Sequence, residues 1–90
     1  MGKEISMSLE REELKALSQE AQNLRPGRYE HYNGKHYQVL GVARHSETLE
    51  EMVVYQSCYG NLEMWLRPLS MFIEIVELPS GSRPRFIFVE

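Results

Sequence analysis

The stretch YEHYNGKHYQVLGVA, residues 29 to 43, decides the fold class. Aromatic and β-branched residues stand on both sides of Asn33-Gly34, and an Asn-Gly pair supplies the positive φ angles of a type I′ turn. We therefore expect two antiparallel strands joined by a two-residue turn. In that register His31 lies directly opposite His36, with the two β-carbons roughly 4.5–5.5 Å apart.

Alternation of apolar and polar residues continues along the rest of the chain and predicts further strands. Strands are expected over residues 29–32, 35–43, 52–58, 62–67, 72–76 and 85–89, with a loop at 79–82. Short strands separated by turns favour a mainly β fold, a small antiparallel barrel of about five strands. Closing, or nearly closing, the barrel also removes the exposed strand edges that a small sheet would leave.

Residues 7–24 are predicted to form the one substantial helix, which Pro26-Gly27 ends. Spacings of three and four create an apolar stripe, made of Leu14, Leu17, Ala21 and Leu24. Because a helix this short is marginal alone, the stripe must pack on the barrel or on another chain. A homo-oligomer through its three leucines is one alternative. The domain organisation expected is a helical extension over 1–25 and a barrel domain over 26–90.

Composition narrows the classes of function. The 90 residues contain 10 Lys and Arg against 13 Asp and Glu, a net charge of −3. An acidic chain lacks the basic surface that drives nucleic-acid binding, so a nucleic-acid partner is not expected. No segment has the ~20 consecutive apolar residues of a membrane span, and the N-terminus has no signal-peptide core. The single cysteine, Cys58, is expected to be buried and inert, and a cytoplasmic location is the default.

The predicted strand over residues 62–67 carries the only tryptophan. Alternation puts Leu62, Met64 and Leu66 on one face, which we expect to join the core. Trp65 and Arg67 then share the outer face, where an aromatic ring and a guanidinium could stack on a ligand and donate hydrogen bonds to it. The alternative is that the N-terminal helix covers Trp65.

A dense polar block, Arg44 to Thr48, separates two apolar runs. Three interpretations remain open: a solvated loop, in which Thr48 and Glu51 form a capping box; a binding site; or an acid–base pair of His45 and Glu47, with arginines binding an anionic group. No phosphate-cradling loop, nucleophile elbow or metal motif is present. Two histidines at the first turn do not make a metal site without a third ligand, so no metal or cofactor is expected.

Three segments together resemble a known family. GRYEHYNGKHYQVLGVARHSETLEEMVVYQSCYG, MWLRPLSMFIEIV and PRFIFV are similar to the bacterial domain of unknown function 1653, over residues 27 to 89. The resemblance implies an SH3-type β-barrel and brings no reaction, substrate or cofactor. The family pattern matches Arg44, His45, Ser46, Glu47 and Thr48, and later Trp65, Arg67, Pro68, Met71 and Phe72. Asn33 replaces a common lysine and Cys58 a usual aliphatic residue.

The function expected from these observations is a small binding module whose polar cleft takes an anionic or peptide ligand. The expected ligand-binding residues are Arg44, His45, Glu47, Thr48, Trp65 and Arg67. The alternatives are a small enzyme that uses His45 and Glu47, and an interaction or dimerisation module that uses the N-terminal helix.

Overall fold

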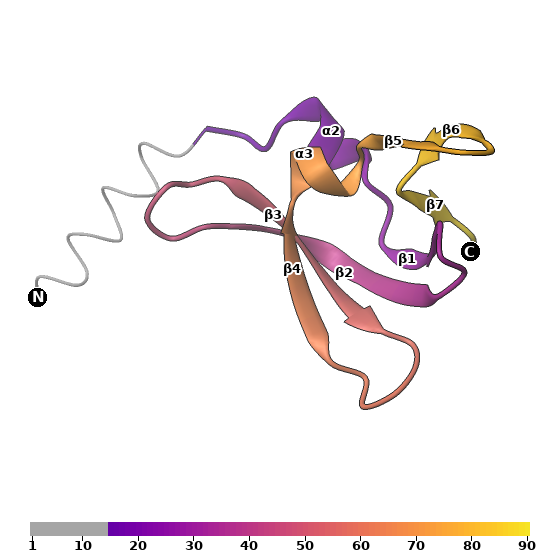
Figure 1. Cartoon of the computed structure of the whole chain (residues 1–90). Helices are drawn as coiled ribbons and strands as arrows, with labels where there is room; N and C mark the ends of the chain where they lie inside the picture. Colours follow the sequence, from indigo (N-terminus) through magenta and orange to yellow (C-terminus); the bar gives the residue numbers. More distant parts are fainter. Residues whose placement is uncertain (1–14) are drawn as a thin grey trace, which may run out of the picture.

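The computed structural model describes residues 15–90 and is mainly β, as predicted (Figure 1). Two short helices, α2 (Gln19–Asn23) and α3 (Leu69–Phe72), accompany seven strands. The strands are β1 (Gly27–His31), β2 (His36–Arg44), β3 (Glu51–Ser57), β4 (Met64–Pro68), β5 (Ile75–Leu78), β6 (Gly81–Pro84) and β7 (Phe86–Phe88). None of the helices in the described region is long and apolar enough to cross a membrane.

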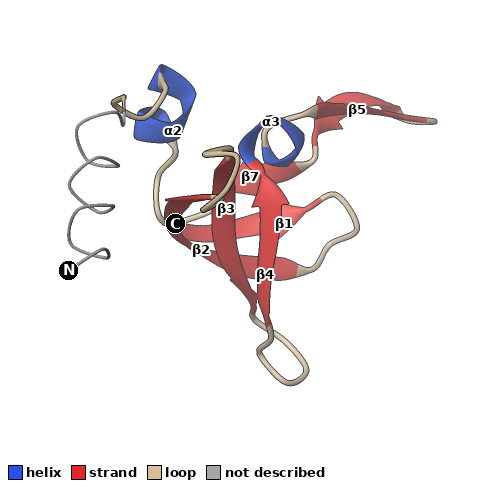
Figure 2. Cartoon of the chain, turned by 90° about the vertical axis from the view of Figure 1, so that its left-hand side faces the viewer, coloured by secondary structure: helices blue, strands red, loops and turns tan. Residues whose placement is uncertain are grey.

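Five strands form one antiparallel sheet in the order β4-β3-β2-β1-β7, and β5 and β6 form a separate hairpin. Figure 2 shows β1 to β4 curling around a common interior. The hydrogen-bonded ladder does not close, because β4 and β7 are not paired. Side chains lie across the opening instead: the guanidinium of Arg67 in β4 lies 6.0 Å from the ring centroid of Phe86 in β7. The result is a partly open barrel.

The interior of the curl is packed with aromatic rings. Phe72 and Phe86 stack with centroids 4.0 Å apart and planes 5° from parallel. Tyr29 and Tyr55 meet Phe72 edge-on at 5.6 and 5.4 Å, geometries that aromatic pairs favour. The buried core consists of Ala21, Tyr29, Val39, Val53, Tyr55, Leu69, Phe72 and Phe86. Residues from α2 and α3 therefore close the core together with four strands.

The register of the first hairpin differs from the prediction by one position. Glu30, not His31, pairs with His36. The His31 carbonyl accepts from the Gly34 N–H at 2.8 Å, and the His31 N–H donates to the Lys35 carbonyl at 2.8 Å, so three residues form the loop. Asn-Gly also occurs in three-residue loops, and here the connection contains one residue more than the two-residue turn that was predicted. The predicted juxtaposition of the two histidines was wrong, since the register puts them on opposite faces of the sheet.

The predicted helix over 7–24 is shorter in the region that can be described. Its residues 1–14 lie outside the described chain, residues 15–18 have no regular structure, and α2 begins at Gln19. Ser18 ends the extended segment because its hydroxyl accepts the Ala21 N–H at 3.1 Å, which makes it the N-cap. Leu17 and Leu24 pack against the barrel core, whereas Leu14 lies outside the described residues.

The region after β4 also departs from the prediction. The strand expected over 72–76 is replaced by α3 and the start of β5, because Pro68 directs the chain into one helical turn. The loop expected at 79–82 is shorter, since Pro79-Ser80 alone make the turn and β6 begins at Gly81. The chain thus gains a projecting hairpin, visible at the right of Figure 1.

The aliphatic face of β4 points outward, contrary to the prediction. Leu62, Met64 and Leu66 are 53%, 55% and 62% exposed. Trp65 and Arg67 lie on the inner side, because their partners across the ladder, Tyr55 and Val53, are core residues. Alternation distinguishes the two faces of a strand but does not say which one the sheet curls around.

The single cysteine is exposed, which corrects the expectation of a buried thiol. In β3 the buried residues are Val53, Tyr55 and Ser57, so alternation directs Cys58 outward at the end of the strand.

Candidate functional site

A cavity of about 300 Å³ opens on the inner side of β3 and β4. We call it the aromatic pocket. Its lining comes from β1, β2, β3, β4, β7 and two connecting loops, and consists of His31, Asn33, Tyr37, Tyr55, Tyr59, Trp65, Arg67 and Phe86. The pocket lies directly above the stacked rings of the core, because Tyr55 and Phe86 belong to both.

Trp65 and Arg67 are held in fixed orientations at the pocket. The Trp65 indole Nε1–H donates to the Ser57 hydroxyl at 2.8 Å, and Ser57 is buried. The Arg67 Nε–H donates to the Tyr55 hydroxyl at 3.3 Å. Trp65 is still 44% exposed, so part of the residue remains accessible to a ligand. The part of the sequence prediction that placed these two side chains on one face is therefore confirmed.

Two tyrosines form the wall opposite β4. The hydroxyls of Tyr37 and Tyr59 are 2.8 Å apart, and the Lys35 ammonium lies 4.8 Å from the centroid of the Tyr59 ring. Burial, together with this hydrogen bond, raises the pKa of Tyr37 to about 12. The same hydrogen bond lowers the pKa of Tyr59. Tyr59 is consequently the partner that ionises first, and Tyr37 then acts as donor to it.

His31 contributes a neutral imidazole. Its Nδ1 accepts the Asn33 backbone N–H at 3.1 Å, which places the ring proton on Nε2. Burial lowers the pKa of His31 below 6.5, and the positive charges of Arg85 and Arg67 lower it further. The ring also meets Phe86 edge-on at 4.9 Å. At neutral pH His31 can thus offer a hydrogen-bond donor without adding a charge.

The charge of the pocket lining is positive. Arg67 lines the cavity, and none of the lining residues is acidic. Arg85 stands nearby but its guanidinium binds Glu74 at 3.1 Å, whereas Arg67 has no ion-pair partner in residues 15–90. Aromatic cages that bind cations attract positive charge to ring faces. Here a cation would be repelled by Arg67, so the arrangement suits an anionic group beside a planar one.

The polar block from Arg44 to Thr48 covers the last residue of β2 and most of the turn that leads to β3. The His45 Nδ1 accepts the Glu47 and Thr48 backbone N–H groups at 3.1 and 3.3 Å. The backbone N–H of His45 donates to the Glu50 carbonyl at 2.8 Å. These bonds satisfy main-chain groups that an exposed turn would otherwise leave to water. The histidine acts here as a turn-forming residue, and no carboxylate of the described chain lies within ion-pair distance of it.

Other members of the block bind neighbouring backbone. An Arg44 guanidinium N–H donates to the Lys15 carbonyl, which ties the hairpin to the segment before α2. The Thr48 hydroxyl accepts the Glu50 N–H at 3.2 Å. The proposed capping box of Thr48 and Glu51 is not formed, because the Glu51 carboxylate accepts from Ser18 instead.

The structure divides the six predicted ligand-binding residues into two groups. Arg44 pairs with Glu51 at one end of β3, whereas Trp65 pairs with Tyr55. The two positions are four residues apart along β3, about 13 Å at 3.3 Å per residue. Figure 1 shows the β2–β3 turn projecting to the left, away from the β3–β4 loop at the bottom. Trp65 and Arg67 therefore share the aromatic pocket, and Arg44, His45, Glu47 and Thr48 lie at the hairpin tip.

Sequence reasoning missed most of the pocket wall, since among the lining residues it named only Trp65 and Arg67 as ligand-binding. One signal was available. Tyr37 and Tyr55 occupy inward positions of two strands, on the same side as Trp65, and Tyr59 follows β3 by two residues. Phe86 and His31 could not be added this way, because their place depends on β7 pairing with β1.

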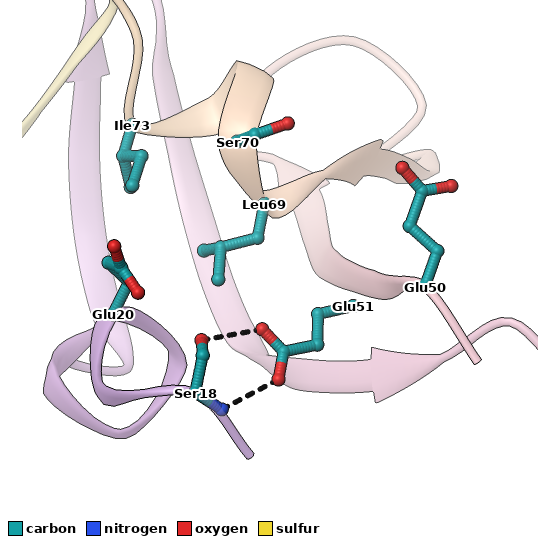
Figure 3. Close-up of a pocket in the computed structure, with 7 residues that line it drawn as sticks. All are labelled: Ser18, Glu20, Glu50, Glu51, Leu69, Ser70 and Ile73. Carbon is teal, nitrogen blue, oxygen red and sulfur yellow. Dashed lines mark hydrogen bonds between the residues drawn. The ribbon is translucent and has the colours of Figure 1, made fainter.

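A second cavity, also about 300 Å³, lies between α2 and α3 (Figure 3). It is lined by Ser18, Glu20, Glu50, Glu51, Leu69, Ser70 and Ile73. The Glu51 carboxylate accepts from the Ser18 N–H at 2.7 Å and from its hydroxyl at 2.6 Å, and these bonds lower the pKa of Glu51. In residues 15–90 no three His, Cys, Asp or Glu side chains come together as a metal site would require. The cavity therefore lies at the contact between α2 and the barrel, where the bonds between Ser18 and Glu51 hold the helix in place.

Comparison with known proteins places the chain in a family. Residues 27–88 match the model of a family described as Protein of unknown function (DUF1653). The chain belongs to this family. A crystal structure of a DUF1653 protein from Bordetella bronchiseptica is similar to it, with 44% identity and a TM-score of 0.72, over 77% of this chain and 91% of that one. A comparison with curated proteins gave no match.

The DUF1653 match begins at the first residue of β1 and ends with β7. It therefore includes every residue of the aromatic pocket and the whole polar block, and it leaves α2 outside.

Proposed function

We propose that this DUF1653 domain is a small binding module and that the aromatic pocket holds its ligand. The ligand expected carries a carboxylate or phosphate group next to a planar ring or peptide unit. Arg67 carries this proposal, because its guanidinium is fixed at the pocket by Tyr55 and has no carboxylate partner in the described chain. A guanidinium has five N–H donors, so four remain for an anion.

The exposed rings supply the second part of the recognition. Trp65 is 44% and Tyr59 39% exposed, and both orientations are fixed by hydrogen bonds within the chain. Rigid, preorganised rings lose little conformational entropy when a planar group stacks on them. A cavity of about 300 Å³ suits a fragment-sized ligand or one residue of a peptide.

A reducing, cytoplasmic setting in a bacterium completes the proposal. The exposed thiol of Cys58 supports the compartment, since free surface cysteines are uncommon in proteins of oxidising environments. The bacterial origin of the similar crystal structure supports the kind of host.

The test is chemical-shift mapping of the isotope-labelled full chain with three probes: an aromatic carboxylate, a nucleoside monophosphate and a short peptide with a free C-terminus. We expect one class to shift the Trp65 indole N–H and the Arg67 Nε–H signals. Arg67→Gln should weaken that binding at least about tenfold, since a charge-assisted hydrogen bond is worth ~1.5–3 kcal/mol.

The matched control is Arg28→Gln, which removes a guanidinium that binds Glu90 and does not line the pocket. It should bind like the wild type. Signals that shift only at the β2–β3 turn, or equal binding by the Arg67→Gln and wild-type proteins, would contradict the proposal.

A further inference from the structure

The outer edge of β4 has no strand partner in the described chain. β4 stands at the end of the five-stranded sheet and pairs only with β3. Exposed strand edges are usually covered, charged or paired with another chain. Here the side chains at the edge are aliphatic and about half exposed. We propose that this edge pairs with the same edge of a second copy, giving an antiparallel dimer around a two-fold axis.

The ladder between β3 and β4 decides which backbone groups are free. The Ser57 N–H donates to the Glu63 carbonyl at 2.9 Å, so Glu63 directs its backbone toward β3. Antiparallel bonding alternates along the strand, so Trp65 and Arg67 do the same. Met64 and Leu66 consequently direct their N–H and C=O groups to the open edge, and their side chains are also the exposed aliphatic ones.

A two-fold axis at Trp65 uses all of these free groups. It sets Met64 opposite the partner's Leu66 and Leu66 opposite the partner's Met64. Residues that face each other in this way exchange both of their backbone hydrogen bonds, so each of the two pairs forms two. The aliphatic side chains of the two copies then cover each other on the outer face.

The neighbouring registers lose hydrogen bonds. An axis at Met64 would need Leu62, whose N–H already donates to Tyr59 and whose carbonyl accepts the Gln56 side chain at 2.8 Å. An axis at Leu66 would set Met64 opposite Pro68 of the partner subunit, and proline has no N–H to give. Pro68 thus ends the free edge and limits the pairing to one register.

Charge complementarity supports a second copy as the occupant. With the axis at Trp65, Glu63 lies directly opposite the partner's Arg67, and symmetry creates this pair twice. In residues 15–90 neither side chain has an ion-pair partner within its own chain. Opposite charges directly across a ladder stabilise the pairing. Arg67 has enough N–H groups to bind this carboxylate and a ligand at once.

The mass of the full chain in solution tests the proposal. Analytical ultracentrifugation over a wide concentration range should show a monomer–dimer equilibrium. Met64→Lys with Leu66→Lys places four like charges along the seam and should leave only monomer, with an unchanged circular dichroism spectrum. The control Leu40→Lys changes an exposed residue of β2, away from the edge, and should still dimerise. A wild type that is monomeric throughout, or a Met64→Lys/Leu66→Lys variant that dimerises normally, would overturn the proposal.

Charge reversal tests the register. Glu63→Arg alone, or Arg67→Glu alone, should raise the dimer dissociation constant about tenfold, because like charges then face each other twice. The double variant restores both pairs and should restore the affinity. Single reversals without effect, or a double variant weaker than either single one, would exclude this register and the dimer built on it.

Discussion

At the scale of single residues, histidines have three different environments in this domain. His31 is partly buried at the aromatic pocket, His45 accepts backbone N–H groups at a turn, and His36 lies 3.8 Å from Glu30. The sequence suggested acid–base or metal chemistry for such residues. In the structure His31 lines the pocket and His45 forms a turn, and burial lowers the pKa of His31.

His31 should make stability depend on pH. Its pKa in the folded chain is lower than 6.5, so the unfolded chain binds the proton more readily. Stability from this group is full above about pH 6.5 and is lost as pH falls through the lower folded value. Urea unfolding at several pH values should show this loss in the wild type, and His31→Gln should remove that part of the dependence. The imidazole signals in an NMR titration measure the pKa directly, and a value at or above 6.5 would contradict the expectation.

At the scale of elements, the question is what holds α2 on the barrel. The helix has only five residues, too few to be stable alone. Ser18 caps it and also bonds to Glu51 of β3, while Ala21 is buried in the core. One serine thus joins the start of the helix to the sheet.

Ser18→Ala should therefore cost more than an ordinary surface change. Removing an N-cap destabilises by about 0.5–2 kcal/mol, and here the Glu51 carboxylate also loses a donor. The expected result is a lower urea midpoint and faster hydrogen exchange in residues 19–23, with β1 to β4 protected as before. Ser80→Ala, in the β5–β6 turn, is the control and should change little. Unchanged exchange in α2 would show that the leucines alone fix the helix.

Many of the secondary-structure elements were predictable from the sequence. Strands around Tyr37 and Val53 follow from alternation, and Pro26-Gly27 marks the end of the helical segment as expected. The one-residue slip at the first hairpin was not predictable, because Asn-Gly fits two loop lengths. The outward face of Leu66 was not either, since the direction in which a sheet curls depends on strands far away in sequence.

At the scale of the whole molecule, core and pocket share residues. Phe86 stacks on Phe72 in the core, and its ring also lines the aromatic pocket next to Arg67. No backbone hydrogen bonds join β4 and β7 at this place. The two strands are connected there by side-chain packing alone. The candidate site could be predicted only in part for the same reason: Trp65 and Arg67 share one strand, but Phe86 comes from the other end of the sheet.

Substitutions at Phe86 should therefore affect stability and binding together. Phe86→Ala removes a buried ring, and such changes cost about 3–5 kcal/mol, which a domain of this size barely tolerates. Phe86→Leu keeps most of the volume and should fold with a smaller loss. Denaturant unfolding measures the stability of both variants. Ile87→Ala, on the exposed side of β7, is the control. A Phe86→Leu protein as stable as the wild type would mean that the ring stack adds nothing beyond volume.

The bond from Trp65 to Ser57 has a practical consequence. Trp65 is the only tryptophan of the chain, so all indole fluorescence comes from one ring whose orientation is fixed. A ligand that stacks on the ring, or a second copy whose strand pairs beside it, should change the emission wavelength and intensity. The domain thus carries its own optical probe at the place where both proposals meet, and unlabelled protein suffices to search for what it binds.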